Sequence, residues 1–207
     1  YGYDVLESVY GKPYLLQSVT ISFVDKFSNE NASGEILITN NSKGLSIDIH
    51  IKDFDANKQS DINTILHEMA HAYHGIASLP PVFEEGMAVA VTDVVMAKMI
   101  ASNKLASFSS LYIQLSDEQY NAEKETLQIP LDSDRFYNSD SVIDFYQHVG
   151  KAWYKLYQAD SNFFLKFNEK LYERKNNGFD TGPTEVKNII KEIIPSADLT
   201  GAAFEPI

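Results

Sequence analysis

The sequence predicts an α+β fold in which a small N-terminal β-sheet precedes a mostly helical C-terminal part. Three stretches between residues 18 and 52 are rich in β-branched residues, and clusters of Asn, Gly and Ser separate them, as in strands joined by turns. From Lys58 onward the apolar residues recur at helical spacing. We therefore expect one domain over residues 1–207, with a β-rich subregion at 1–57 and a helical subregion at 58–207.

The N-terminal part is expected to begin with a helix over residues 2–10 and to continue with three strands. In the third strand apolar and polar residues alternate, which predicts one face in the core and one polar face. The expected strands are Ser18–Val24, Gly34–Thr39 and Leu45–Lys52.

The helical part is expected to start with a long helix that runs to about Tyr73. Ser60 is the expected N-cap of this helix, and Gly75 can end it. Pro80 then forces a turn, and a second helix begins near Val82.

Further along the chain, residues 103–139 show little pattern beyond a short helix around Asp117–Lys124. Ser141-Val142-Ile143-Asp144 resembles a capping box, and Pro183 suits the first turn of a helix. Three more helices are expected at Asp140–Tyr157, Asn162–Arg174 and Thr184–Ile194.

The most informative motif is His67-Glu68-Met69-Ala70-His71, which lies inside the first long helix. Residues four apart on a helix share a face, with Cβ atoms about 5–6 Å apart, so both imidazoles can bind one Zn²⁺ at about 2.0–2.1 Å. Glu68 lies one position further round, where it can reach the metal's water and act as a general base. A catalytic zinc keeps one position open beside three protein ligands, and Glu85 in the next helix is a candidate third ligand.

Three neighbouring kinds of site are excluded by spacing and composition. His74 is seven residues from His67, or about 10 Å along the axis, so one helix cannot direct all three histidines at one ion. A metzincin requires a histidine six residues after His71, where this chain has Ala77. A deformylase-type site requires a cysteine ligand, and the chain has no cysteine.

Composition limits the partners of the chain. Its net charge of −12 would repel nucleic acid and anionic membranes. No apolar run approaches the roughly 18 residues that span a bilayer. The chain does not begin with Met, which favours a processed or trimmed start and a secreted, periplasmic or cell-surface location.

The order of three strands, a His-Glu-x-x-His helix, a short loop and a helix with Glu-Gly resembles the gluzincin zinc peptidases, a peptidase-MA-like group that includes thermolysin-like enzymes and related zinc aminopeptidases. In that family the ligand glutamate commonly lies directly before a glycine. The segment Pro81-Val82-Phe83-Glu84-Glu85-Gly86-Met87-Ala88 is similar to it, which favours Glu85 over Glu84. The resemblance implies a zincin-like fold, with the small sheet packed on the active-site helix, and zinc-dependent hydrolysis of peptide or protein substrates.

The resemblance also implies a donor for the oxyanion. Tyr146, four residues before Gly150, is similar to the transition-state tyrosine of small peptidase-MA-like proteins. Its alternative is a core role among neighbouring aromatic residues, in which case His148 or Tyr137 would take its place. The spacer between His71 and the glutamate is shorter than in thermolysin, and no Gly-x-Met-Glu-Asn element is present, which puts exopeptidase activity in doubt.

Three roles stay open at the level of sequence. Glu84 and Asp93 are candidates for orienting the ligand histidines, with Asp93 favoured because it interrupts an apolar run. The strand Leu45–Lys52 is either a substrate-binding edge strand or an ordinary strand with a solvated face. The alternative function is a catalytically inactive zincin-fold binding or structural domain, against which the presence of Glu68 speaks.

Overall fold

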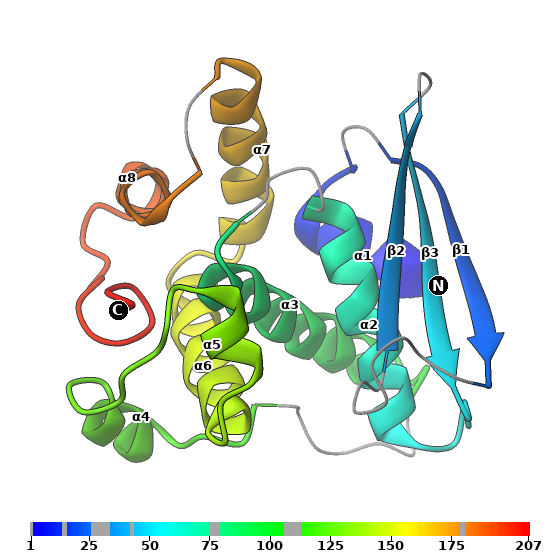
Figure 1. Ribbon diagram of the computed structural model, residues 1–207, viewed down its shortest axis with the longest axis horizontal. Helices are drawn as coiled ribbons and strands as arrows, with labels where there is room; N and C mark the ends of the chain where they lie inside the picture. The colour runs from blue at the N-terminus through cyan, green and yellow to red at the C-terminus, as the bar shows by residue number, and fades with distance from the viewer. Residues whose placement is uncertain are drawn as a thin grey trace.

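A computed structural model of the chain describes residues 2–13, 16–25, 34–41, 44–74, 79–105, 113–178 and 181–207. It is a mixed α/β structure that is mostly helical, with the strands gathered at one side and the C-terminal helices at the other (Figure 1). Its elements are α1 (Gly2–Tyr10), β1 (Leu16–Val24), β2 (Gly34–Asn41), β3 (Gly44–Lys52), α2 (Gln59–His74), α3 (Pro81–Ala101), α4 (Asp117–Glu123), α5 (Ser133–Tyr137), α6 (Val142–Ala159), α7 (Phe163–Asn176) and α8 (Pro183–Ile193).

The three strands form one mixed sheet in the order β1-β3-β2. β3 is parallel to β1 and antiparallel to β2. The alternation predicted for β3 is confirmed, because Ile47, Ile49 and Ile51 are buried while the polar residues between them are partly exposed. The edge position considered for this strand is wrong. Its own pattern shows which face is buried but not which strands flank it, and β1 and β2 pair along its two sides.

The start of α2 differs from the expectation. The helix begins at Gln59, so Ser60 lies in its first turn and its hydroxyl donates to Oδ1 of Asp61 at 2.9 Å. The other oxygen of Asp61 accepts a hydrogen bond from the backbone N–H of Asp55 at 2.8 Å, which ties the preceding loop to the helix. The expected end at Gly75 lies outside the described residues.

In the C-terminal part, the backbone conformation of the N-cap residue decides whether a capping box forms. Ser141 is the N-cap of α6, but the capping box expected there is wrong, because its φ of −95° and ψ of 13° lie outside the extended region that caps use and no side-chain cap bond forms. Ser116, at φ −70° and ψ 164°, forms a capping box with Gln119 at the start of α4. Pro183 occupies the first turn of α8, as predicted.

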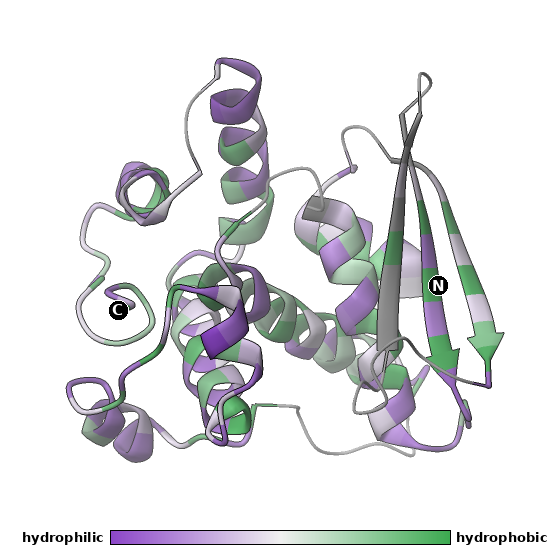
Figure 2. Ribbon diagram, in the orientation of Figure 1, coloured by the Kyte–Doolittle hydropathy of each residue, from purple (hydrophilic) through white to green (hydrophobic). Residues whose placement is uncertain are grey.

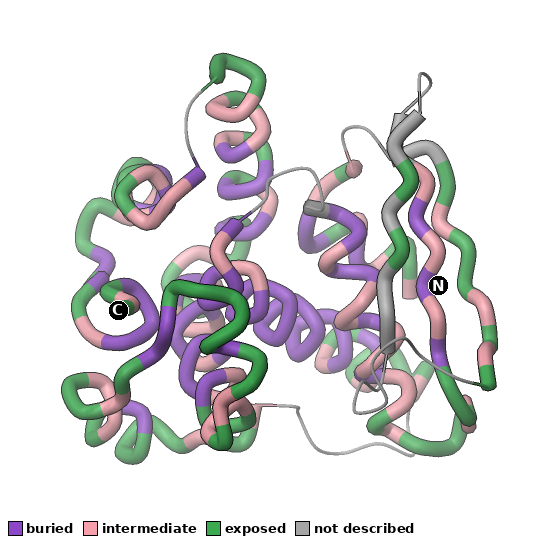
Figure 3. The backbone as a smooth tube through the Cα atoms, viewed as in Figure 1, coloured by how far each residue is buried: buried purple, intermediate pink, exposed green. Residues whose placement is uncertain are grey.

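α3 is the central helix of the molecule. It is apolar along most of its length and buried along most of its surface (Figures 2 and 3). It packs on α1 and α2 toward the sheet and crosses α6 on its other side. One core cluster runs from the isoleucines of β3 through α2 and α3 to the C-terminal segment at Phe204.

Two glycines allow the close crossing of α3 and α6. A Cβ on Gly86 of α3 would lie 2.4 Å from Cδ1 of Trp153, and a Cβ on Gly150 of α6 would lie 2.3 Å from Cγ1 of Val89. Gly150 thus permits the close approach of α6 to α3, the helix that carries Glu85. The position of α6 against α3 therefore depends on the absence of both side chains.

Within the described residues, no helix combines the length and apolar character needed to cross a membrane. The 21-residue α3 is long enough, but Glu84, Glu85, Asp93 and Lys98 interrupt its apolar sequence.

Gly150→Ala is expected to lower the free energy of unfolding by about 1–2 kcal/mol, because the cost of overpacking exceeds the gain in helix propensity. Urea denaturation measures the loss. Gly2→Ala is the control, because its new Cβ would meet Leu66 at an ordinary 3.5 Å. Val89→Ala should cost less stability in Gly150→Ala than in the wild type, because it removes the atoms that the new Cβ would meet; purely additive losses would show that this contact does not limit the crossing.

Candidate metal centre

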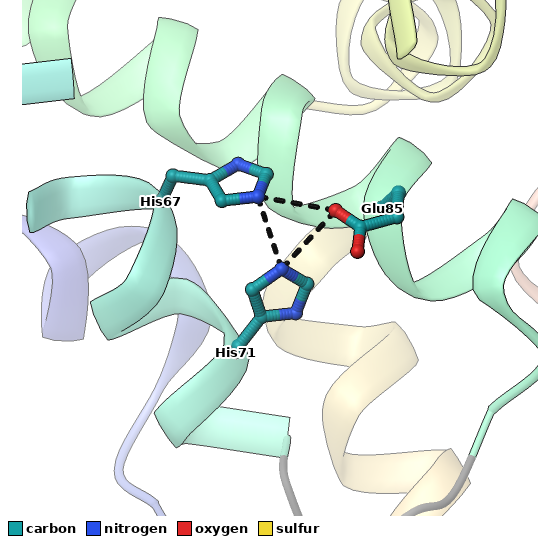
Figure 4. Close-up of side chains that lie close together, drawn as sticks. All are labelled: His67, His71 and Glu85. Atoms are coloured by element: carbon teal, nitrogen blue, oxygen red, sulfur yellow. Dashed lines mark hydrogen bonds and ion pairs between the residues drawn. The ribbon is translucent and has the colours of Figure 1, made fainter. Parts of the chain in front are cut away.

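The candidate site lies where α2 and α3 pack against each other. His67 and His71 lie one turn apart on α2, and Glu85 faces them from α3 (Figure 4). The α2 residues that pack toward the core, among them Leu66, Met69 and Tyr73, fix the rotation of the helix. Both histidines are consequently directed at α3 rather than at solvent, with 15% and 12% of their side chains exposed.

Three ligand atoms form a nearly equilateral triangle. Nε2 of His67 lies 3.0 Å from Nε2 of His71 and 3.1 Å from Oε2 of Glu85, and the third side, from His71 to Glu85, is 3.2 Å. Ligand atoms at about 2.0–2.1 Å from a tetrahedral zinc are separated by about 3.3 Å, so the triangle has nearly the size that this ion requires. Among the residues that the structure describes, these three alone form a group that could hold a metal ion.

The electrostatics of the triangle favour a bound cation. Burial alone would raise the pKa of Glu85, but the adjacent His71 and His67 hold it well below its usual value. Burial alone would lower the pKa of His71, but the carboxylates of Glu85 and Glu84 raise it well above its usual value. A buried carboxylate beside two imidazoles therefore needs positive charge, which either a proton or a metal ion can supply.

Glu68 lies on α2 next to His67, and its side chain is not among the grouped ligand atoms. Burial raises its pKa, while the nearby histidines act in the opposite direction. The structure thus places a second carboxylate beside the triangle, on the same helix as both histidines.

The two acids considered for orienting the histidines have different surroundings. Oε1 of Glu84 lies 3.5 Å from Nδ1 of His71, on the side of the ring away from the triangle. Asp93 lies two turns further along α3 and accepts a hydrogen bond from the backbone N–H of Ile113 at 2.8 Å. The preference for Asp93 is wrong: its burial reflects a bond to the main chain, and Glu84 is the acid that contacts a histidine.

The three candidate donors for the oxyanion lie in different surroundings. The ring centroid of Tyr146 lies 6.1 Å from that of His67, so this residue borders the site. His148 lies on another face of α6, fully buried, with its ring stacked on Tyr120 at 4.7 Å and Nδ1 3.5 Å from Glu123. Its neighbours are thus residues of α4 and not members of the triangle.

The contact that sequence reasoning missed is made by Tyr137. Its hydroxyl donates a hydrogen bond to Oε1 of Glu85 at 2.7 Å. Tyr137 ends α5, a helix of five residues that was not expected, since so short a segment carries no periodic signal. Asp132, which caps α5 by accepting from the N–H of Arg135, was the one local feature that could have indicated it.

Comparison with protein-family models, with curated proteins and with solved structures gives no match for this chain. The functional argument accordingly rests on the residues of the site.

His148 makes stability depend on pH. Burial, with a smaller effect of Lys124, lowers its pKa from 6.5 to about 4, so below pH 6.5 the unfolded chain binds a proton that the folded chain does not. The free energy of unfolding should thus fall by about 2 kcal/mol between pH 7 and pH 5 from this residue alone. His148→Phe removes that part of the loss. Equal pH slopes for the variant and the wild type in urea denaturation would contradict the assignment.

Proposed function

We propose that the chain is a zinc-dependent peptidase of the gluzincin type, with a zincin-like fold. The observation that carries this proposal is the triangle of His67, His71 and Glu85 ligand atoms with Glu68 beside it. Two imidazoles and one carboxylate are the protein ligands of a known class of catalytic zinc site, whereas structural zinc sites fill all four positions with protein ligands. The described part of the chain offers three.

The arrangement of the elements supports the same proposal. The three-stranded sheet packs on α2, the helix that carries both histidines, and the glutamate comes from the next helix. β2, rather than β3, is the antiparallel edge strand, and it also contacts α2. An extended peptide can add to such an edge by backbone hydrogen bonds, so a peptide or protein substrate suits this side of the site.

The chemistry divides between the metal and the protein. When bound, zinc polarises the scissile carbonyl and acidifies a water molecule. Glu68 accepts a proton from that water while the water oxygen bonds to the carbonyl carbon. Glu68 then delivers the proton to the leaving nitrogen as the C–N bond breaks. Tyr146, at the border of the site, donates a hydrogen bond to the oxyanion. Glu84 orients the ring of His71.

The decisive experiment measures metal content and peptide hydrolysis together. The wild type should bind one zinc per chain and cleave casein or fluorogenic peptides in a chelator-sensitive way. Glu68→Gln should keep the zinc and the fold but lose hydrolysis, because the amide preserves shape and removes the base. Glu125→Gln, at an exposed position, is the matched control.

Other outcomes would redirect the proposal. Iron instead of zinc would point to the oxygen-activating centres that also use two histidines and a carboxylate. A zinc-loaded wild type without hydrolysis would favour the non-catalytic zincin domain. Retention of zinc in His71→Ala would remove the triangle as the site, with His50→Ala, on the sheet, as the control.

Tyr146→Phe is expected to lower kcat by about 10²–10³-fold while KM and zinc content change little, because only the oxyanion donor is lost. Tyr154→Phe on the same helix serves as the control. Steady-state kinetics with one peptide substrate measure the effect. If the variant keeps wild-type kcat but melts earlier, Tyr146 is a core residue and not a donor.

A further inference from the structure

The two oxygens of the Glu85 carboxylate have different partners. Oε2 faces Nε2 of both histidines at 3.1 and 3.2 Å. Oε1 accepts the hydrogen bond from the hydroxyl of Tyr137 at 2.7 Å. The carboxylate is therefore held at both ends, with one oxygen in the ligand triangle and the other bonded to a side chain from a different helix.

Tyr137 reaches this position from a firmly anchored turn. Its neighbour Phe136 is fully buried, and the Phe136 ring packs against Phe145 at 5.5 Å and Tyr146 at 5.9 Å. Asp132 caps the start of α5, and the side chain of Asn138 donates to the carbonyl of Asp134 at 2.9 Å beyond its end. The phenol thus comes from a short helix fixed at both ends, which makes its bond to Glu85 a defined contact.

Only the hydroxyl of Tyr137 contacts the site. The ring itself is on the surface, with the residue 45% exposed, so only its polar end enters the site. A protonated phenol presents one O–H, and here it is directed at Oε1.

We propose that Tyr137 is a positioning residue of the metal centre, which holds Oε1 of Glu85 so that this carboxylate binds the ion through Oε2 alone. The inference rests on the proposed function, because it requires a metal at the triangle. Its chemical consequence is a single carboxylate oxygen at the ion, which leaves room for a water molecule or substrate carbonyl. Tyr137 and Tyr146 accordingly have separate tasks: Tyr137 sets metal affinity and coordination, and Tyr146 acts on the oxyanion.

The test compares Tyr137→Phe with Tyr146→Phe and Tyr154→Phe in the full chain. Zinc affinity is measured by competition with a chromogenic chelator, and the ligand geometry by the visible absorption of the Co²⁺-substituted protein. Tyr137→Phe should weaken zinc binding by about 10–100-fold, as is typical when the hydrogen-bond partner of a ligand is removed. Its Co²⁺ spectrum should change as Oε1 becomes free to approach the ion. The other two variants should keep wild-type affinity and spectrum.

Wild-type zinc affinity and an unchanged Co²⁺ spectrum in Tyr137→Phe would overturn the inference and leave the proposed function intact. Failure of the wild type to bind Zn²⁺ or Co²⁺ would instead overturn the proposed function and this inference with it. Thermal melting of the metal-free proteins distinguishes a general loss of stability from a specific effect on zinc binding. If metal-free Tyr137→Phe melts like the wild type, its weaker zinc binding is a property of the metal centre. If it melts earlier, and the loss of stability accounts for the whole loss of zinc affinity, the result counts against a positioning role.

Discussion

Glu85 carries a carboxylate into the interior of the helical part, and an isolated charge there would be strongly unfavourable. Its burial is tolerated because both oxygens have partners: the imidazoles of His67 and His71 at Oε2 and the phenol of Tyr137 at Oε1. Those partners come from α2 and α5, so the relative positions of three helices are tied to one charged group. A change in any of the three contacts would leave a buried polar atom without its partner.

The crossing of α3 and α6 supplies the rest of the geometry. Gly86 follows Glu85 directly, and its missing side chain leaves the space that Trp153 fills. Gly150 does the same for Val89 from the other helix. The resulting contact places α6 close enough for Tyr146, one turn before Gly150, to border His67. The two glycines thus act on the site indirectly. They set the distance between the backbones of α3 and α6, and that distance determines where the side chains of the site lie.

The sequence predicted the elements well, because the long helices and the alternating strand carry strong periodic signals, and each predicted boundary lies within two residues of the observed one. The histidine spacing placed two ligand atoms together by helix geometry alone. Three features were not predictable in this way. Strand order depends on pairing between separate segments, the five-residue α5 is too short to show a period, and the bond from Tyr137 to Glu85 joins residues 52 positions apart. Burial of Asp93 was similarly ambiguous, since a backbone partner satisfies a carboxylate as well as an imidazole does.

The charge of the site would link folding to the binding of a metal ion. Glu68, Glu84 and Glu85 bring three carboxylates to the two ligand histidines, and the whole chain carries a net charge of −12. Without a metal ion, the raised pKa of His71 favours a proton on this imidazole beside the buried carboxylate, and a protonated Nε2 cannot be a ligand. A divalent ion would supply a larger positive charge at the same place. Because the unfolded chain does not assemble the triangle, the binding free energy of such an ion would add to the free energy of unfolding. The packing of α2, α3 and α5 therefore buries a negative charge that a bound metal ion would balance.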